Sequence, residues 1–206
     1  MRSLLSFIFV FFAATALAGQ DTPIRTLDEA GQYLARISGA SLRAYSTRDF
    51  GRDRFTGARS VIVPADQAQP LLRKLRRALA PGLVAFVGTT RSLAKPMVKG
   101  YELVVGEGGN QFAILRIAAS DAVNYDKTTE DLITKLQQWD AAYGIDIWQA
   151  ETDTIQLRLK KMPADLHGFA KEVYAFCPDI IDQGVGSVDA LASEIRRTES
   201  LFLWWD

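Results

Sequence analysis

The sequence has little of the chemistry on which most hydrolases and metalloproteins depend. It contains one cysteine, Cys177, and one histidine, His167, among 206 residues. A single cysteine cannot form an intramolecular disulfide, and this pair cannot supply the ligands of a zinc site built from His and Cys. A Ser-His-Asp triad would have to use His167, and no nucleophile-elbow motif surrounds Ser187 or Ser193. We therefore expect no cofactor and no catalytic residue of these classes.

The pattern around the cysteine favours a structural thiol. Leu166, Ala170, Val173 and Cys177 recur at helical spacing, and Pro178 ends the helix. This places Cys177 on the buried face and at a helix C-terminus, where the helix dipole disfavours a thiolate. His167 lies roughly 15 Å away along the same helix axis, so the two side chains cannot pair.

Long apolar runs are confined to the first residues. Met1-Arg2-Ser3 is basic, 4–17 is apolar, and Ala16-Leu17-Ala18 has small residues where a signal peptidase reads. About 14 apolar residues fall short of the roughly 20 that span a bilayer. We predict a signal peptide over 1–18, cleavage after Ala18, a periplasmic or secreted protein, and no stable membrane anchor after cleavage.

The net charge is zero, but the two halves differ in sign. Residues 25–99 hold 14 Lys and Arg against 5 Asp and Glu, while residues 100–206 hold 9 against 18. The asymmetry indicates either a partner-binding face or two halves that attract each other, and we favour the second interpretation. The basic helix face at 73–77 lacks interleaved aromatic residues, so we expect no nucleic-acid partner.

The spacing of apolar residues predicts an α+β fold. Helices are expected after Thr26, Asp66, Thr128, Asp165 and Ser187, with strands at 60–63, 83–87, 101–105, 145–149, 154–160 and 201–205. Residues 43–59 are interpreted as an exposed basic loop. We expect a mixed or mostly antiparallel sheet with helices largely on one face. The predicted regions are 19–99, basic and α/β, and 100–206, a C-terminal domain with a ferredoxin-like order of elements.

One segment concentrates polar and reactive groups around a glycine-containing loop at 178–186. Together with the end of the chain it supplies the candidate functional residues Cys177, Pro178, Asp179, Asp182, Gln183, Gly184, Trp204, Trp205 and Asp206. Two hypotheses remain open for them. The loop can bind an envelope or secreted protein, or Asp179, Asp182 and Asp206, with Asp189 nearby, can hold a divalent cation for hydrolysis or bind a small molecule. No loop motif supports the metal, so we assign none.

The C-terminal half resembles a known bacterial family. The resemblance rests on Asn124-Tyr125-Asp126, Trp139-Asp140, Cys177-Pro178-Asp179, Asp182-Gln183-Gly184 and the terminal Trp204-Trp205-Asp206, which occur in the expected order. The family is domain of unknown function four-two-five-three, and the resemblance covers roughly residues 100–206. It implies a domain boundary and carries no activity. From the residues we expect a non-catalytic binding or interaction module, by analogy immunity-like, with an enzyme using the aspartates as the alternative.

Overall fold

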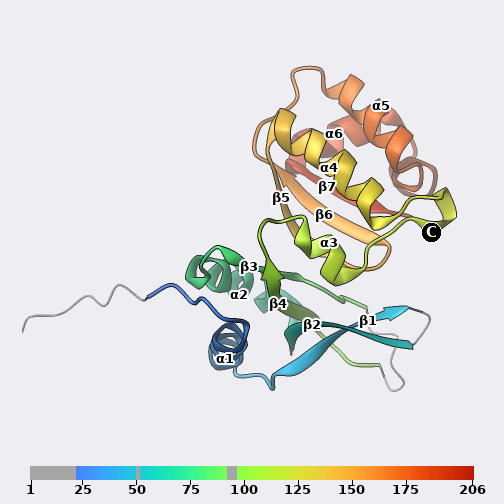
Figure 1. The fold of residues 1–206 in the computed structure, drawn as a ribbon. Helices are drawn as coiled ribbons and strands as arrows, with labels where there is room; N and C mark the ends of the chain where they lie inside the picture. The colour runs from blue at the N-terminus through green and yellow to red at the C-terminus, as the bar shows by residue number, and fades with distance from the viewer. Residues whose placement is uncertain (1–21, 50–51, 92–96) are drawn as a thin grey trace, which may run out of the picture.

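The strands of both halves form a single sheet. A computed structural model describes residues 22–49, 52–91 and 97–206 (Figure 1). The strand order is β1-β2-β4-β3-β5-β6-β7, and neighbouring strands are antiparallel except for the parallel pair β3 and β5. The prediction of an α+β fold with a mixed, mostly antiparallel sheet is confirmed. The predicted signal peptide lies outside the described residues.

The helices and strands alternate in short groups along the chain. They are α1 (Leu27–Ser38), β1 (Arg43–Asp49), β2 (Arg52–Val63), α2 (Ala65–Ala78), β3 (Gly82–Val87), β4 (Tyr101–Gly108), α3 (Ala113–Ala118), the 3-10 helix η1 (Val123–Tyr125), α4 (Thr129–Tyr143), β5 (Ile145–Ala150), β6 (Thr154–Leu159), α5 (Leu166–Phe176), the π-helix η2 (Ile180–Val185), α6 (Val188–Thr198) and β7 (Ser200–Trp204). Of the helices that the structure describes, none is long and apolar enough to cross a membrane.

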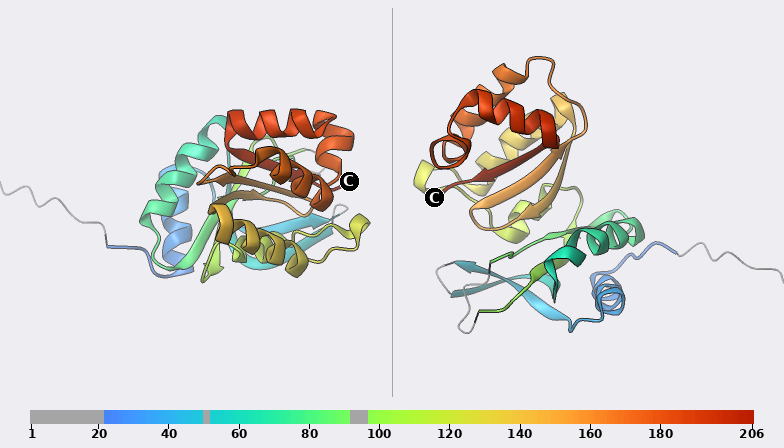
Figure 2. Two further views of the ribbon diagram at one scale, coloured as in Figure 1. Left: turned by 90° about the horizontal axis from the view of Figure 1, so that it is seen from above. Right: turned by 180° about the vertical axis from the view of Figure 1, so that it is seen from behind.

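Helices α1 and α2 cover one face of the N-terminal strands (Figure 2). Helix α1 begins after Thr26, as predicted, at a capping box in which Thr26 Oγ1 accepts from the Glu29 N–H at 3.3 Å and the Glu29 carboxylate accepts from the Thr26 N–H at 3.2 Å. These two bonds satisfy backbone groups that have no partner inside the helix. The helix then buries Leu34 against Val61 and Leu103 of the sheet. The cap thereby sets where the first amphipathic face begins.

The exposed basic loop predicted for residues 43–59 is wrong. This segment forms the hairpin β1–β2, which pairs Arg43 with Ser60 and shifts register at a bulge between Ala44 and Ser46. Tyr45 and Ala58 point into the core, while Arg54 and Phe55 are exposed. The segment is rich in arginine, and the bulge interrupts its two-residue period. Both effects hide the alternation that identifies a strand.

The C-terminal strands are buried on one face only. Ile155, Leu157 and Leu159 of β6 join the core that α4, α5 and α6 cover, whereas Gln156 is half-buried and Arg158 is exposed. The period of two that the sequence shows at 154–160 therefore describes this strand correctly. The opposite face of β5, β6 and β7 carries no helix of its own half, and it forms one wall of the cleft described below.

The strand order corrects the ferredoxin-like expectation for the C-terminal half. A ferredoxin-like sheet interleaves its strands, but β5, β6 and β7 are neighbours in chain order, and β3 separates β4 from β5. The short turn at 151–153 makes β5 and β6 a hairpin, and β7 returns antiparallel to β6. Strand β4 pairs with β2 and β3 of the N-terminal half instead.

A short parallel pairing joins strand β3 to strand β5, at Val87 and Gln149. Beside this pairing, Arg76 of α2 donates to the carbonyls of Ala85 at 2.7 Å and Ile147 at 2.5 Å and forms an ion pair with Asp146 at 2.7 Å. The Arg76 guanidinium thus connects α2 to both paired strands, β3 and β5. This ion pair is in line with the interpretation that the basic and acidic halves attract each other.

We expect Arg76→Ala to lower the free energy of unfolding by about 1–3 kcal/mol, because it leaves the carbonyls of Ala85 and Ile147 without their donor. Arg77→Ala on the exposed side of the same helix is the matched control and should stay within about 0.5 kcal/mol of the parent. Urea unfolding of the two variants measures both. Equal stabilities would contradict the role given to Arg76.

Candidate functional site

The sequence-predicted residues at 177–179 bind the end of the chain to the end of α5. The Cys177 thiol donates to the Trp204 carbonyl at 3.0 Å, and the Trp204 N–H donates to the Cys177 sulfur at 3.3 Å. The thiol is buried, as the helical spacing predicts, and burial raises its pKa to about 11. A thiol that is protonated and paired with the backbone is a poor nucleophile. Cys177 therefore acts as a partner for the edge strand β7.

Asp179 connects three segments that are distant in sequence. Its Oδ1 accepts from the Tyr125 hydroxyl at 2.7 Å and from Gln183 Nε2 at 3.0 Å, and its Oδ2 accepts from the Asp206 N–H at 2.9 Å. Burial alone would raise the pKa of this carboxyl, which is 3% exposed, but the three donors together lower it. The bond to Asp179 in turn raises the pKa of Tyr125 to about 12. We call Tyr125, Cys177, Asp179 and Trp205 the C-terminal clasp.

The two terminal tryptophans divide between core and surface, as expected for adjacent strand residues. Trp205 is buried, its Nε1 donates to the Phe176 carbonyl at 3.3 Å, and its ring meets the Phe176 ring edge-on at 5.5 Å. Trp204 is half-buried. The clasp thus holds the end of α5 and the residues before η2 against β7 and the end of the chain.

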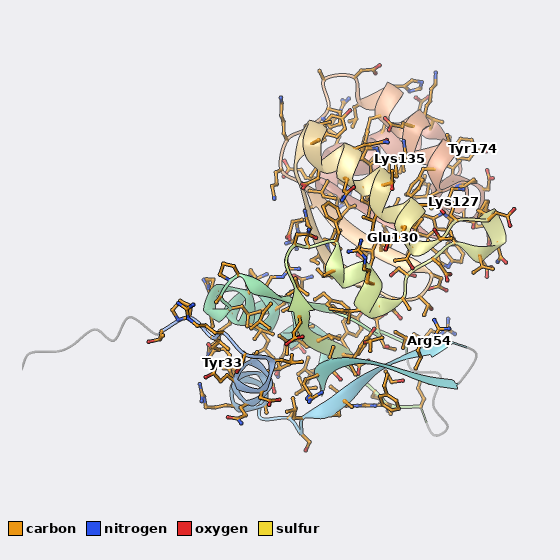
Figure 3. The ribbon with its side chains drawn as sticks, viewed as in Figure 1. Tyr33, Arg54, Lys127, Glu130, Lys135 and Tyr174 are labelled. Carbon is orange, nitrogen blue, oxygen red and sulfur yellow. The ribbon has the colours of Figure 1, made fainter. Side chains whose placement is uncertain are left out.

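The other candidate residues lie on the outer side of this corner. Pro178 is half-buried, and its carbonyl accepts from the N–H groups of Ile181 and Asp182 in the π-helix. Asp182, Gln183, Gly184 and Asp206 are exposed. Asp182 accepts from the Tyr174 hydroxyl at 3.0 Å. Figure 3 shows Tyr174 on the side of the C-terminal half where Figure 1 marks the C-terminus, above that mark. The structure therefore brings Asp179 to the backbone of Asp206 and leaves Asp182 beside Tyr174.

The carboxylates at this corner do not form a metal site among the described residues. No group of three His, Cys, Asp or Glu side chains in 22–49, 52–91 and 97–206 is placed to hold an ion. Asp179 already accepts three hydrogen bonds within the protein. Asp189 lies 3.0 Å from His167 at the surface, at the other end of α5 from Cys177.

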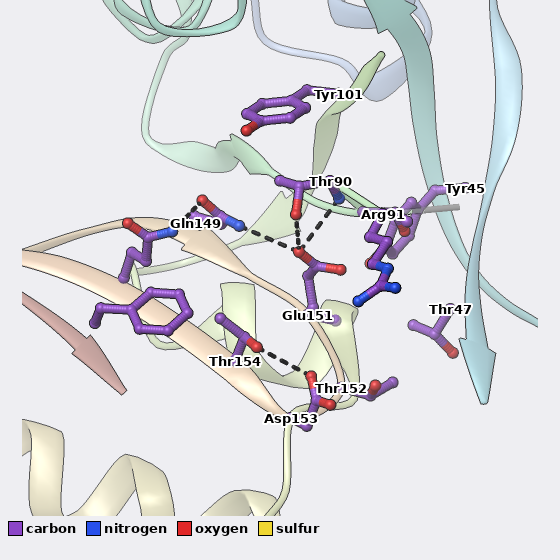
Figure 4. A pocket seen from close by; sticks show the side chains of 14 residues that line it. Tyr45, Thr47, Thr90, Arg91, Tyr101, Gln149, Glu151, Thr152, Asp153 and Thr154 are labelled. Carbon is purple, nitrogen blue, oxygen red and sulfur yellow. Dashed lines mark hydrogen bonds between the residues drawn. The ribbon is translucent and has the colours of Figure 1, made fainter. Parts of the chain in front are cut away.

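A cleft at the junction of the two halves contains the polar groups that sequence reasoning missed. It has a volume of about 600 Å³ and lies between the uncovered face of β5–β7 and the segment that follows β3 (Figure 4). Its lining combines threonines, glutamines, charged residues and aromatic rings, namely Tyr45, Thr47, Thr89, Thr90, Arg91, Tyr101, Ala118, Gln149, Glu151, Thr152, Asp153, Thr154, Gln156 and Phe202. Both halves contribute, so neither forms the cleft alone.

A chain of hydrogen bonds runs along one wall of the cleft. Gln156 Nε2 donates to Gln149 Oε1 at 2.7 Å, and Gln149 Nε2 donates to Glu151 Oε1 at 3.2 Å. From the other half, the hydroxyl and N–H of Thr90 donate to the same Glu151 oxygen at 2.6 and 3.2 Å. Burial outweighs these three bonds and raises the pKa of Glu151. The carboxylate is thus held in one orientation by donors from both halves.

The strand pairing explains why these residues meet. Because β3 and β5 are parallel, both chains leave the sheet at the same edge, Thr89 and Thr90 after Val87 and Glu151 after Ala150. Crevices beyond the carboxyl ends of parallel strands are common ligand sites in open α/β sheets. The available sequence signal was the polar run 88–90 after an apolar strand, but nothing in the sequence pairs it with 149–151.

We expect Asp179→Asn to destabilise the fold by about 1–3 kcal/mol at neutral pH, because an amide N–H would then face the Asp206 N–H. The folded pKa of Asp179 is lowered, so the stability it contributes is present above its unfolded value of about 4 and is lost as the pH falls through the folded pKa. Denaturation from pH 7 to pH 3 should show the difference between parent and variant shrinking below about pH 4. Asp182→Asn is the exposed control, and equal losses for both variants would refute the clasp.

Comparison with known proteins matches the C-terminal half to a family. A family model described as Domain of unknown function (DUF4253) matches residues 102–206, which begin in β4 and run to the chain end. The matched span contains the clasp and the wall of the cleft formed by Gln149, Glu151 and Gln156, but not the wall formed by Tyr45 and the segment 89–91. Neither the curated proteins nor the solved structures include a match.

Proposed function

We propose that this chain, which belongs to the family Domain of unknown function (DUF4253), is an exported, non-catalytic binding protein that holds a small polar molecule in the junction cleft. The observation that carries the proposal is the cleft itself. It is concave, both halves line it, and its polar groups are already oriented by the hydrogen bonds between Gln156, Gln149, Glu151 and Thr90. Binding sites are usually formed in advance in this way, with a few fixed polar groups and aromatic walls.

The hydrogen-bonding roles of the residues that line the cleft favour binding over catalysis. Glu151 accepts from threonine and glutamine donors, and no described histidine or cysteine lines the cleft. A carboxylate, amides and hydroxyls held in one chain of bonds suit recognition of a polar ligand. The aromatic rings of Tyr101 and Phe202 provide surfaces for its apolar part. Phe202 is 49% exposed, which fits a side chain that a ligand covers.

The cleft is tested by filling it. Gln156 lies between Gln149 and Phe202 in the cross-strand row, so Gln156→Trp places an indole inside the cleft. Arg158→Trp is the control, since it lies two residues along the same strand and face but outside the cleft lining. A screen of polar metabolites by thermal shift should find compounds that raise the Tm of the parent and of Arg158→Trp but not of Gln156→Trp. A screen in which no compound distinguishes the two variants would refute the cleft as the binding site.

The loop at 178–186 supports a second candidate, the binding of an envelope or secreted protein. Its outer residues Asp182, Gln183, Gly184 and Val185 are exposed, and the buried Asp179 holds the loop in place. An ordered, exposed loop costs little conformational entropy on binding. An immunity-like protein that neutralises a toxin belongs to this class.

Export and the loop are tested in one experiment. The full chain with a C-terminal tag should be recovered from the periplasmic fraction with Gly19 as its first residue. Proteins captured with it should be absent when Gln183 and Val185 are both changed to Ala and should remain when the exposed pair Arg73 and Lys74 is changed in the same way. Retention of residues 1–18 in the cytoplasmic fraction would refute export, and capture that does not depend on Gln183 and Val185 would refute the loop.

A further inference from the structure

We propose that the junction cleft selects a ligand with an organic cationic group, a primary ammonium, amidinium or guanidinium, and that Glu151 binds this group. The inference rests on the proposed binding function and adds the chemical class of the ligand. It starts from the way in which the two oxygens of the Glu151 carboxylate differ.

Among the described residues, one oxygen of Glu151 accepts several hydrogen bonds and the other accepts none. All three hydrogen bonds to this carboxylate, from the Thr90 hydroxyl, the Thr90 N–H and Gln149 Nε2, go to Oε1. Oε2 accepts no hydrogen bond from any described residue, although the side chain lines the cleft and is half-buried. Burial of a carboxylate is costly unless both oxygens have partners. The open oxygen therefore needs a donor from the ligand.

The charges around the cleft favour a donor that is also a cation. The lining holds two carboxylates, Glu151 and Asp153, and one cation, Arg91, which is exposed and has no ion-pair partner among the described residues. A further carboxylate, Glu102, is 4% exposed and is held by the Ser60 hydroxyl at 2.6 Å. Burial raises the pKa of Tyr45, and the charges of Glu102 and Glu151 raise it further. Among the described lining residues, negative charges therefore outnumber the one positive charge, which Arg91 carries beside Glu151 (Figure 4).

The neutral groups lining the cleft also suit an organic cation. The Gln156 amide donates to Gln149 and leaves its own oxygen as an acceptor, so the hydrogen-bond chain presents acceptors at both ends. The rings of Tyr101 and Phe202, which are not fully buried, offer faces that attract a cation and cover its carbon skeleton. A bare metal ion does not fit, because the described residues hold no group of three His, Cys, Asp or Glu placed to ligate one.

The test uses benzamidinium as the probe, with benzamide as its neutral analogue of the same shape and maltose as a neutral polyol. Binding to the full mature protein is followed by NMR through the side-chain amides of Gln149 and Gln156. Benzamidinium should shift both amides and bind roughly ten- to a hundredfold more tightly than benzamide, the range expected for a hydrogen bond to a charged group. Its affinity should fall as the pH drops through the Glu151 pKa, because protonation removes the negative charge.

Glu151→Gln is the informative variant. The glutamine oxygen can still accept from Thr90 and Gln149, while its amide nitrogen takes the place of the open Oε2, so the fold contacts persist and the acceptor becomes a donor. Benzamidinium should lose roughly tenfold or more in affinity and its pH dependence in this variant. Asp153→Asn is the matched control, because it removes an exposed carboxylate of the same cleft that bonds the Thr154 hydroxyl, and it should keep the tight binding.

The outcomes separate the two proposals. Equal binding of benzamidinium and benzamide in the cleft, or binding of maltose alone, would overturn the cationic ligand and leave the cleft as a binding site. Benzamidinium binding that Glu151→Gln does not weaken would also overturn the inference. If no probe shifts the Gln149 and Gln156 amides, the cationic ligand is overturned, and the Gln156→Trp screen decides separately whether the cleft binds any polar molecule.

Discussion

The parallel pairing of β3 with β5 is the constraint on which the rest of the structure depends. Among the described strands, it joins the group β1-β2-β4-β3 to the group β5-β6-β7, at Val87 and Gln149. Arg76 reinforces it from α2 by bonding to both strands. Because the paired strands run in the same direction, the segments that follow them leave at the same edge. The junction cleft is a direct consequence of this geometry.

Several residues on which the family resemblance rests have a structural role, because they bind the end of the chain to the rest of the domain. Cys177 pairs with the backbone of the edge strand β7, and Asp179 receives the last backbone N–H of the chain. Edge strands expose unpaired backbone groups, so a buried thiol and a carboxylate that bond to them protect that edge. The clasp leaves the outer side of the η2 loop exposed while holding its base. A structural role for the buried residues and a binding role for the exposed ones are therefore compatible.

The local elements were largely predictable, and the exceptions have a common cause. The caps at Thr26 and Thr128, the strand at 154–160 and the burial of Cys177 all follow from patterns within a few residues. The strand pairing within 43–59 was missed because the many arginines of this segment and its bulge hide the period of two, whereas the strand at 60–63 was predicted. The ferredoxin-like order was wrong because hairpin connections place β5, β6 and β7 side by side. Periodicity identifies an element but does not choose its neighbours.

The sequence alone determined the α+β class, most helices and strands, the burial of the single cysteine and the resemblance to the family. These properties depend on apolar spacing, capping and short motifs, which lie close together along the chain. Only the tertiary structure decided that Glu151 meets Thr90 and that Asp179 meets Tyr125 and Asp206. Each of these contacts joins residues 27 to 61 positions apart. Contacts at such separation depend on strand order and register, and a single sequence carries no local signal for either.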